Sequence, residues 1–565
     1  MRTIALLTLV ASAGAAELIV YNAKILTMDP RRPVAEALAI DGARFARVGT
    51  NKEVLAAAKP DALRIDLRGR TVVPGLYDSH THPIGAALSE IDGAVPVMST
   101  IPEVQAYIRK VAAATPADRV IFVPKVYATR LKERRYPNRH ELDEASPGRL
   151  AMTDNGYASV LNSALLAKAG ITRATPEPAN GKIIRDAKGE PTGLILGATQ
   201  LLGPLRATRS TTRQDSMDGL RKMQRAYNRT GITSTIDRSQ SVEGFRMYQE
   251  LKARGELTVR TCVTIRITPA ASVEKVREQI RAIPFKTGDG DDWLKVGSIK
   301  TVADGGILIG TAFLREPYGE HTQVYGYTDP DYRGVLAVPR ENLIAMARAS
   351  NELGWQMTAH VAGGGAIDAL LDAYEAADRD KSIGARRFTV THGNFPNTAA
   401  IARAKRLGVV FDMQPAWHHF DGAALAPVFG PSRVRDFIPL RSMIDAGVVV
   451  AGGSDHMIRF DSRAAINPYH PFYGMWMTVT RQTAGGGVLG PEQRITREEA
   501  LKMWTWNSAY LSFDEKAKGS IEPGKLADLA VISKDYLKCP VEEIKDIDAL
   551  VTVVDGRVVH GEWPR

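Results

Sequence analysis

Cysteine is nearly absent from this chain of 565 residues, which has only Cys262 and Cys539. Two distant cysteines are too few for a disulfide framework, and neither belongs to a Cys-x-x-Cys pair. After the first few residues, no apolar run approaches the roughly 20 residues that a membrane-spanning helix needs. The sequence therefore argues against cysteine-based chemistry, and we expect no integral membrane segment in the mature chain.

The signatures of nucleotide and nucleic-acid binding are also missing. The 73 Lys and Arg residues outnumber the 63 Asp and Glu residues, giving a formal net charge of +10, but they are scattered and form no long basic block. The glycine runs at 363–365 and 485–487 lack the flanks of a P-loop or a dinucleotide fingerprint. The His-x-Glu and Pro-Cys-x-x-Cys signature of the base-flipping zinc deaminases is absent as well. We expect a small-molecule substrate and no nucleic-acid partner.

The first segment, MRTIALLTLVASAGAAE, has a basic residue at Arg2, a short apolar stretch and small residues at 13–16. This order is typical of a secretory signal peptide, predicted here over residues 1–16 with cleavage near Ala15 or Ala16. A ragged apolar first segment is the alternative interpretation. We expect an exported protein, periplasmic or secreted.

Both ends of the remaining chain have the pattern of short antiparallel strands. ELIVYNAKILTMD and VAEALAIDGARFARVGT near the start, and LADLAVISKDY and ALVTVVDGRVVHGE near the end, alternate apolar and polar residues around turns. Asp555-Gly556 is a hairpin signal. Since chain termini commonly lie close together, we predict one β-sandwich domain from residues 17–70 and 515–565.

Between these ends, short β-rich apolar runs alternate with helical patterns. The eight runs lie at 71–78, 231–237, 259–266, 294–304, 355–360, 388–393, 408–414 and 447–455. Alternating strands and helices indicate a parallel sheet, and eight repeats predict an α/β fold of the (β/α)₈ TIM-like barrel type over 71–83 and 216–514. Residues 84–215 are too long for a barrel connection and carry their own strand and helix signals. We predict an inserted lid or substrate domain there, after the first barrel strand.

The first run ends in PGLYDSHTHP, residues 74–83, with His80 and His82 one residue apart. Alternate residues of a strand point to the same face, so both imidazoles project together at the end of the strand. That end of a barrel is the active-site mouth. Imidazole is a common ligand of catalytic zinc, although two loop histidines with ordinary hydrogen-bond partners would give the same motif.

Other polar residues lie at the same ends of the predicted strands. His360 ends the fifth run, His392 ends the sixth and Asp455 ends the eighth, while Lys300 lies in the fourth run just before Asp304. Independent structural residues have no reason to gather at one end of a barrel. The pattern therefore predicts a metal site.

These motifs resemble the amidohydrolase superfamily of metal-dependent hydrolases, which has His-x-His on strand one, lysine on strand four, histidines on strands five and six, and aspartate on strand eight. The resemblance is closest to the amidohydrolase-3 branch, which includes N-substituted formamide deformylases. It is carried by VVPGLYDSHTHP, ASVLNSALLAKAGIT, GEPTGLIL, GITSTID, KTVADGG, TAFLREPY, GWQMTAH, GGSDH and IEPGKLADLAVI. The metal ligands that it implies are His80, His82, Lys300, His360, His392 and Asp455.

The resemblance also implies a divalent metal, zinc before others, with one or two ions per chain. A lysine ammonium has no lone pair, so Lys300 cannot bind a metal as it stands. In many members of the superfamily this lysine is carboxylated and bridges two metals, which is what the resemblance implies here. An ordinary lysine paired with Asp304 or with a substrate carboxylate is the alternative. Relatives are often oligomeric, so a homo-oligomer is also open.

The implied activity is hydrolysis of an amide-type carbon–nitrogen bond in a small organic molecule by a metal-activated hydroxide. Asp455 is the candidate general base and acid, and His392 or a neighbouring donor is the candidate for stabilising the oxyanion. An esterase, lactonase or carbamate hydrolase using the same site is one alternative. A degenerate, non-catalytic barrel that binds a ligand is the other.

Three positions depart from the pattern of relatives: Gly364 stands where an aspartate is usual, Thr391 where a glutamate is usual, and Tyr157 where a histidine is common. These departures bear on the prediction of the substrate pocket more than on that of the metal site. Several aromatic and basic residues near the strand ends or in the insertion are candidates to contact substrate, although aromatics could equally pack the insertion on the barrel. The candidates are Tyr157, Arg315, Tyr318, Trp417, His418 and His456.

Overall fold

A computed structural model describes residues 17–564 except 92, 179–180, 198–201, 203–204, 206–210 and 328. The predicted signal peptide at 1–16 therefore lies outside the described residues. At the centre of the molecule is a parallel eight-stranded sheet, which confirms the predicted barrel. Its strands, in their order around the sheet, are β8 (Leu76–Thr81), β14 (Ile232–Gln240), β15 (Arg260–Arg266), β16 (Leu294–Val302), β17 (Met357–Val361), β18 (Thr389–His392), β19 (Val410–Met413) and β20 (Val450–Gly452).

The first and last strands meet just beyond β20 and bring the ring to near closure. Thr81 and His456 form a parallel bridge. The His82 amide donates to the His456 carbonyl at 2.8 Å, and the Asp455 amide donates to the His80 carbonyl at 2.8 Å. The bonds that bring the barrel to closure therefore lie within the predicted site.

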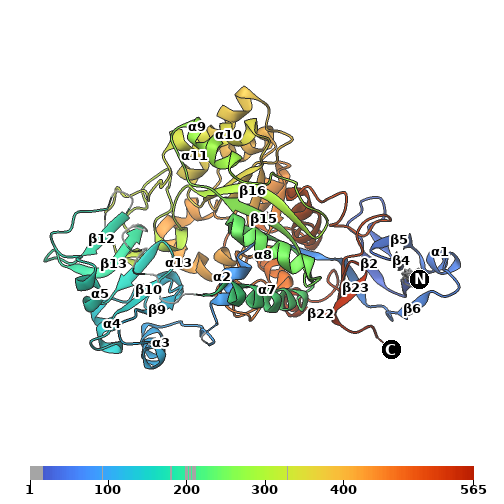
Figure 1. Cartoon of the computed structure of the whole chain (residues 1–565), viewed down its shortest axis with the longest axis horizontal. Coiled ribbons are helices and arrows are strands. Elements are labelled where there is room, and N and C mark those ends of the chain that lie inside the picture. The colour runs from blue at the N-terminus through green and yellow to red at the C-terminus, as the bar shows by residue number, and fades with distance from the viewer. Residues whose placement is uncertain are drawn as a thin grey trace, which may run out of the picture.

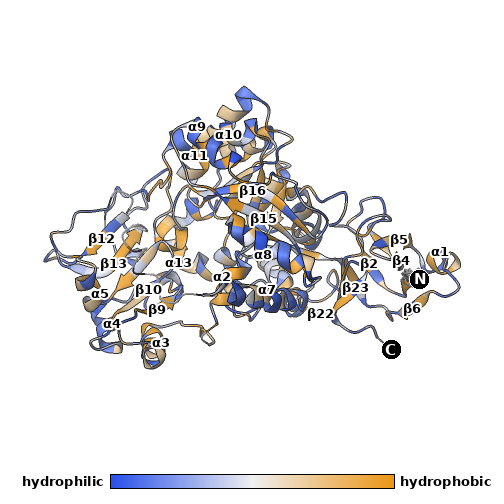
Figure 2. Cartoon of the chain, viewed as in Figure 1, coloured by the Kyte–Doolittle hydropathy of each residue, from blue (hydrophilic) through white to orange (hydrophobic). Residues whose placement is uncertain are grey.

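Helices cover the outside of the barrel (Figure 1). The helix α7 is largely hydrophilic in Figure 2, but Leu220, Met223 and Tyr227 recur at helical spacing and are buried. The barrel helices are α7 (Arg213–Asn228), α8 (Val242–Ala253), α9 (Val273–Arg281), α10 (Arg340–Glu352), α11 (Gly364–Asp380), α12 (Thr398–Leu407), α13 (Ala416–Val434), α14 (Leu440–Asp445), α15 (Pro471–Thr480), α16 (Arg497–Lys502) and α17 (Ser508–Leu511). Within the described residues, no helix is both long and apolar enough to cross a membrane.

Both ends of the chain build two small sheets on one side of the barrel (Figure 1). One has the order β5-β4-β1-β6 and the other β23-β22-β21-β7-β2-β3. Asp555 and Gly556 form the two-residue turn between β22 and β23 with φ of 58° and 73°, as the hairpin signal predicted. The elements are β1 (Leu18–Tyr21), β2 (Lys24–Leu26), β3 (Val34–Ala35), β4 (Ala37–Asp41), β5 (Arg44–Gly49), α1 (Asn51–Ala56), β6 (Leu63–Asp66), β7 (Thr71–Pro74), β21 (Leu529–Ile532), β22 (Ala549–Val554) and β23 (Arg557–Gly561).

The insertion after β8 forms its own five-stranded sheet, of order β12-β13-β11-β10-β9, on the opposite side of the barrel from the two termini (Figure 1). Arg130 anchors it to α13 through an ion pair with Asp421, 2.8 Å between Nη2 and Oδ2. Its elements are α2 (Pro83–Leu88), α3 (Ile101–Ala114), β9 (Ile121–Pro124), α4 (Arg139–Ala145), β10 (Ala151–Asp154), β11 (Ala158–Leu161), α5 (Ser163–Lys168), β12 (Gly181–Arg185) and β13 (Pro191–Gly197).

The run predicted as a single first strand is divided at Gly75. Residues before it pair with β21 in the terminal sheet, and residues after it pair with β14 in the barrel. A side chain at Gly75 would overlap the Thr233 hydroxyl and lie 2.9 Å from Cβ of Asp528. The absence of a side chain therefore allows the terminal sheet to pack directly against the barrel.

Substituting Gly75→Ala is expected to lower the free energy of unfolding by about 1–3 kcal/mol, because the added methyl overpacks a closed contact. Chemical denaturation followed by circular dichroism measures this. Gly85→Ala is the matched control, since its Cβ would meet nothing within 4 Å on the exposed face of α2. Equal stability of the Gly75→Ala variant and the wild type would contradict the close packing.

Candidate metal centre and active site

His80, His82 and Asp455 converge at the carboxyl end of the barrel. His80 and His82 come from the end of β8 and the residue after it, and Asp455 follows β20. Oδ1 of Asp455 lies 3.3 Å from Nε2 of His80 and 3.2 Å from Nε2 of His82. Two imidazole nitrogens and a carboxylate oxygen within 4.8 Å of one another form a group that could hold a metal ion.

The hydrogen bonding of His80 fits a metal ligand. Its Nδ1 lies 2.9 Å from Oδ2 of Asp412, so this nitrogen carries the proton and donates it. Nε2 is then a lone-pair nitrogen, and it is buried with no hydrogen-bond partner among the described residues. Burial holds the pKa of His80 well below 6.5, so the ring is neutral. A buried lone pair without a partner, beside a carboxylate, suits a cation.

His392 and His360 extend this group. The ring centroid of His392 lies 4.9 Å from that of His80 and 4.3 Å from that of His360. His392 Nδ1 donates to Oε1 of Gln414 at 2.7 Å, and His360 Nε2 donates to the Gly305 carbonyl at 2.9 Å. Burial lowers the pKa of both rings, that of His360 to about 4. Each ring therefore keeps one lone-pair nitrogen, Nε2 in His392 and Nδ1 in His360.

Lys300 lies on β16 and is buried. Burial, with Arg238 nearby, lowers its pKa to about 8. A neutral amine is the form that can be carboxylated, and a lowered pKa makes that form accessible. Asp304, the predicted alternative partner, instead accepts backbone N–H bonds from Phe313, Ala362 and Gly363, each at 2.9 Å.

Asp412, near the end of β19, is a candidate functional residue that the sequence motifs did not predict. It accepts hydrogen bonds from Ser79 Oγ at 2.7 Å and Gln414 Nε2 at 3.1 Å, as well as from His80. Arg238 Nη2 lies 3.0 Å from its Oδ2. The signal was an aspartate in the seventh apolar run, GVVFDMQ, where a buried charge needs a reason.

A small cavity of about 60 Å³ adjoins these side chains. Tyr157 and Trp417, both predicted to contact substrate, line it. The Tyr157 ring lies 5.4 Å from His360, and the Trp417 ring lies 4.7 Å from His392. The full lining is Lys125, Tyr127, Asn155, Tyr157, Gly306, Ile307, Leu308, Ile309, His360, Ala362, Asn394, Trp417, Asp455 and Met457.

The insertion supplies one wall of this cavity through a braced turn. Asn155 Oδ1 accepts from the amides of Tyr157 at 3.3 Å and Ala158 at 2.8 Å. Lys125 Nζ donates to the Asn155 carbonyl at 3.0 Å. These bonds fix the turn that carries Tyr157 over His360.

The other four residues predicted to contact substrate lie outside the cavity lining. Tyr318 is fully buried and donates to the Ala312 carbonyl at 2.9 Å. His418 Nε2 donates to the Leu489 carbonyl at 2.9 Å, and His456 Nε2 to the Arg459 carbonyl at 2.6 Å. These contacts hold loops together beneath the surface of the site.

Arg315 is the fourth, and its contacts explain the glycine at 364. Its guanidinium pairs with Asp368, with Nε 2.6 Å from Oδ2 and Nη2 2.8 Å from Oδ1, and donates to the Phe395 carbonyl at 2.9 Å. A side chain at Gly364 would overlap Nη1 of Arg315. Arg315, which occupies the space beside Gly364, is thus paired with Asp368, one helical turn later.

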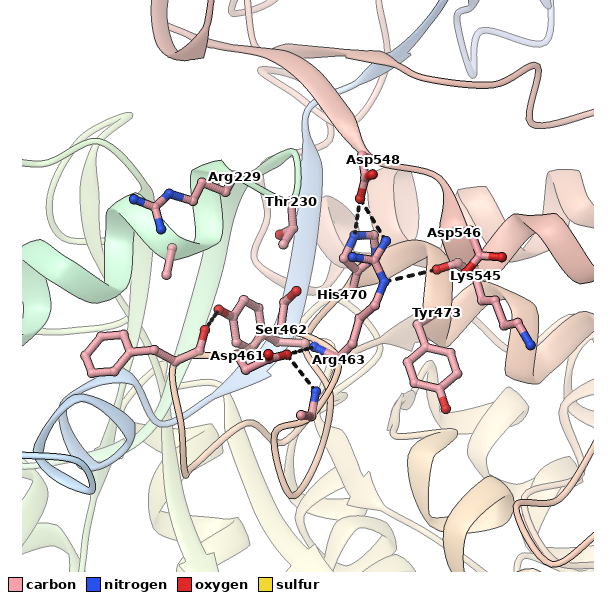
Figure 3. Close-up of a pocket in the computed structure, with 14 residues that line it drawn as sticks. Arg229, Thr230, Asp461, Ser462, Arg463, His470, Tyr473, Lys545, Asp546 and Asp548 are labelled. Carbon is pink, nitrogen blue, oxygen red and sulfur yellow. Dashed lines mark hydrogen bonds and ion pairs between the residues drawn. The ribbon is translucent and has the colours of Figure 1, made fainter. Parts of the chain in front are cut away.

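A larger cavity, of about 720 Å³, lies outside the barrel mouth, and none of the candidate ligands lines it (Figure 3). Arg463 and His470 both reach Asp548 there, with Arg463 Nη2 2.8 Å from Oδ1 (Figure 3). Burial lowers the pKa of His470 to about 3, so the ring is neutral. These contacts tie α15 to the 3₁₀ helix η7 (Val541–Asp546) and the residues after it.

Two histidines and an aspartate lie together at the ends of the first and last strands of the barrel. This arrangement is typical of metal-dependent hydrolases. The sequence pattern of the amidohydrolase family matches residues 64–560. The chain belongs to this family, in its amidohydrolase-3 branch, as the motifs predicted.

Similar proteins agree with this placement. The chain is 29% identical over 558 residues to N-substituted formamide deformylase of Arthrobacter pascens, covering 96% of this chain and 97% of that protein. It is 25% identical over 511 residues to the putative amidohydrolase YtcJ of Bacillus subtilis strain 168, covering 89% and 91%. A metal-dependent hydrolase structure from Pyrococcus horikoshii shares the fold, with a TM-score of 0.68 at 20% identity over 93% of this chain and 99% of that one.

Asp412→Asn is expected to weaken metal binding by about 10- to 100-fold, because the carboxylate orients His80 and strengthens it as a ligand. Competition with a chromophoric chelator measures the affinity. Asp421→Asn is the control, since it breaks another buried pair, with Arg130, away from the ligands. If both variants bind metal as tightly as the wild type, Asp412 has no such role.

Proposed function

We propose that this protein hydrolyses an amide-type carbon–nitrogen bond in a small organic molecule, using a bound divalent metal. The observation that carries the proposal is the convergence of His80 Nε2, His82 Nε2 and Asp455 Oδ1, with the buried His80 nitrogen lacking a protein hydrogen-bond partner among the described residues. The similarity to a deformylase acting on N-substituted formamides supports the choice of an amide.

His80, His82 and Asp455 would hold the metal, and we assign His360, His392 and Lys300 as further ligands, the lysine after carboxylation. Imidazole and carboxylate donors suit zinc. When bound, such an ion would lower the pKa of a water molecule towards neutrality and polarise the carbonyl group of the substrate. The neutral state of the buried histidines keeps their lone pairs available at neutral pH.

Asp455 is our candidate for proton transfer. It takes the proton from the attacking water and delivers it to the leaving nitrogen, so that the amine departs neutral. Its backbone is held in the left-handed region, with φ of 57°, and Asn467 Nδ2 donates to its carbonyl at 2.9 Å. This strained and braced position fixes the carboxylate beside both histidines.

Tyr157 is our candidate for stabilising the oxyanion that forms at the carbonyl. Burial raises the pKa of its phenol, so the hydroxyl stays protonated and can donate a hydrogen bond. His392 suits the role less well, because its proton is already donated to Gln414. The ring of Tyr157 also lies on the cavity wall, 5.4 Å from His360.

Protein purified without added metal or chelator is expected to contain one or two equivalents of a divalent ion, measured by elemental mass spectrometry. Two equivalents would support a carboxylated Lys300 bridge, and one would indicate a single-ion site. His82→Ala is expected to lose most of the metal, whereas His140→Ala, at an exposed position on α4, is expected to keep it. Metal-free wild-type protein that cannot be reloaded would refute the proposal.

Asp455→Asn is expected to lower kcat on N-benzylformamide by about 10²- to 10⁴-fold, the usual contribution of a general acid or base. The assay is run with metal in excess, and metal content is measured on the same sample, so that loss of a ligand is separated from loss of proton transfer. A rate within threefold of the wild type would remove Asp455 from the mechanism.

A further inference from the structure

Asn394 is a buried polar residue of the cavity wall without an assigned role. It follows His392 by two residues, and its backbone carbonyl accepts from the Ile438 amide at 2.8 Å. Its side chain is fully buried, yet neither Oδ1 nor Nδ2 has a hydrogen-bond partner in the described part of the chain. A buried carboxamide with both groups unpaired is unfavourable for folding, so its retention at a binding cavity points to a ligand.

The backbone that presents Asn394 is strained. His392 and Gly393 both have positive φ, of 75° and 46°. A Cβ at Gly393 would lie 2.8 Å from Val390 Cγ1 and 2.9 Å from the Phe411 ring, so only glycine fits there. This sharp turn places the Asn394 carboxamide in the cavity wall and the His392 imidazole against His360 and Trp417, which line the same cavity. Strain of this kind is concentrated at ligand sites.

The other carboxamide of the cavity wall is already used. Asn155 Oδ1 accepts hydrogen bonds from the amides of its own turn, and its Nδ2 donates to the Val126 carbonyl at 3.3 Å. Asn394 therefore offers an unused acceptor and donor in the cavity that Asp455 also lines. In the proposed reaction the leaving nitrogen of an amide would lie in this cavity, within reach of Asp455.

We propose that Oδ1 of Asn394 accepts a hydrogen bond from the N–H of the substrate, and that this contact makes the site selective for secondary amides over esters. The inference rests on the proposed function and names the substrate class of that same site. An ester of the same shape has no N–H, so it leaves Oδ1 buried and unpaired. The proposed hydroxide attack is the same for an amide and for an ester, so Asn394 supplies the discrimination between them.

The test compares two unreactive ligands that differ by one group, N-benzylmethanesulfonamide and 2-phenylethyl methyl sulfone, in which CH₂ replaces N–H. Calorimetry on the metal-loaded full chain measures both affinities for the wild type, Asn394→Leu and the control Asn397→Leu. Asn397 lies in the same loop but caps α12, accepting from the Ala400 amide at 2.9 Å. In parallel, kcat/KM is measured for N-benzylformamide and benzyl formate.

The wild type and Asn397→Leu are expected to bind the sulfonamide roughly 10- to 100-fold more tightly than the sulfone, and Asn394→Leu is expected to bind them equally. The amide-to-ester ratio of kcat/KM is expected to fall by a similar factor in Asn394→Leu alone. An unchanged ligand preference in Asn394→Leu with intact amide hydrolysis would overturn this inference and leave the proposed function standing. Selective binding by the wild type without hydrolysis of either substrate would overturn the proposed function and not the contact.

Discussion

The carboxylate of Asp412 is the constraint on which the site depends. It accepts a hydrogen bond from His80 Nδ1, which fixes the tautomer of this candidate ligand, and another from Gln414 Nε2. The amide oxygen of Gln414 in turn accepts from His392 Nδ1. One buried charge thus orients two imidazoles from two strands. Arg238 lies 3.0 Å from the same carboxylate, so the charge is paired inside the barrel. Both oxygens of the Asp412 carboxylate have hydrogen-bond partners, which holds the carboxylate in one orientation.

A second acidic residue, Asp78, links barrel closure to the position of the candidate ligands His80 and Asp455. Its Oδ1 accepts from the amides of His80 and Ser454, both at 3.0 Å, and its Oδ2 accepts from the Ser454 hydroxyl at 2.6 Å. The residue after Ser454 is Asp455. The contact that joins the first strand to the last therefore also holds the backbone of His80 close to that of Asp455.

The sequence predicted the eight barrel strands and the position of the polar residues at their ends, because both follow from local rules of strand period and chain direction. The break at Gly75 was not predictable, since it depends on Thr233 and Asp528, which are distant in sequence. The placement of Arg315 depended on Asp368 in the same way. Residue type identified groups able to do chemistry, but only tertiary contacts decide whether a guanidinium or an imidazole faces the cavity or a buried carbonyl.

The candidate metal ligands and most of the cavity wall come from different parts of the chain. The residues proposed to carry out the reaction are therefore largely separate from those proposed to select the substrate. The barrel strands and the residues just after them carry the candidate ligands, whereas the insertion and the loops after β16 and β18 line most of the cavity. The turn that carries Tyr157 is held by its own hydrogen bonds, so little order has to be gained when a substrate enters. A rigid wall that carries one unpaired carboxamide, that of Asn394, disfavours a ligand that lacks a matching hydrogen-bonding group. A substitution in the insertion or in these loops can therefore change the cavity wall without touching the Asp412 network.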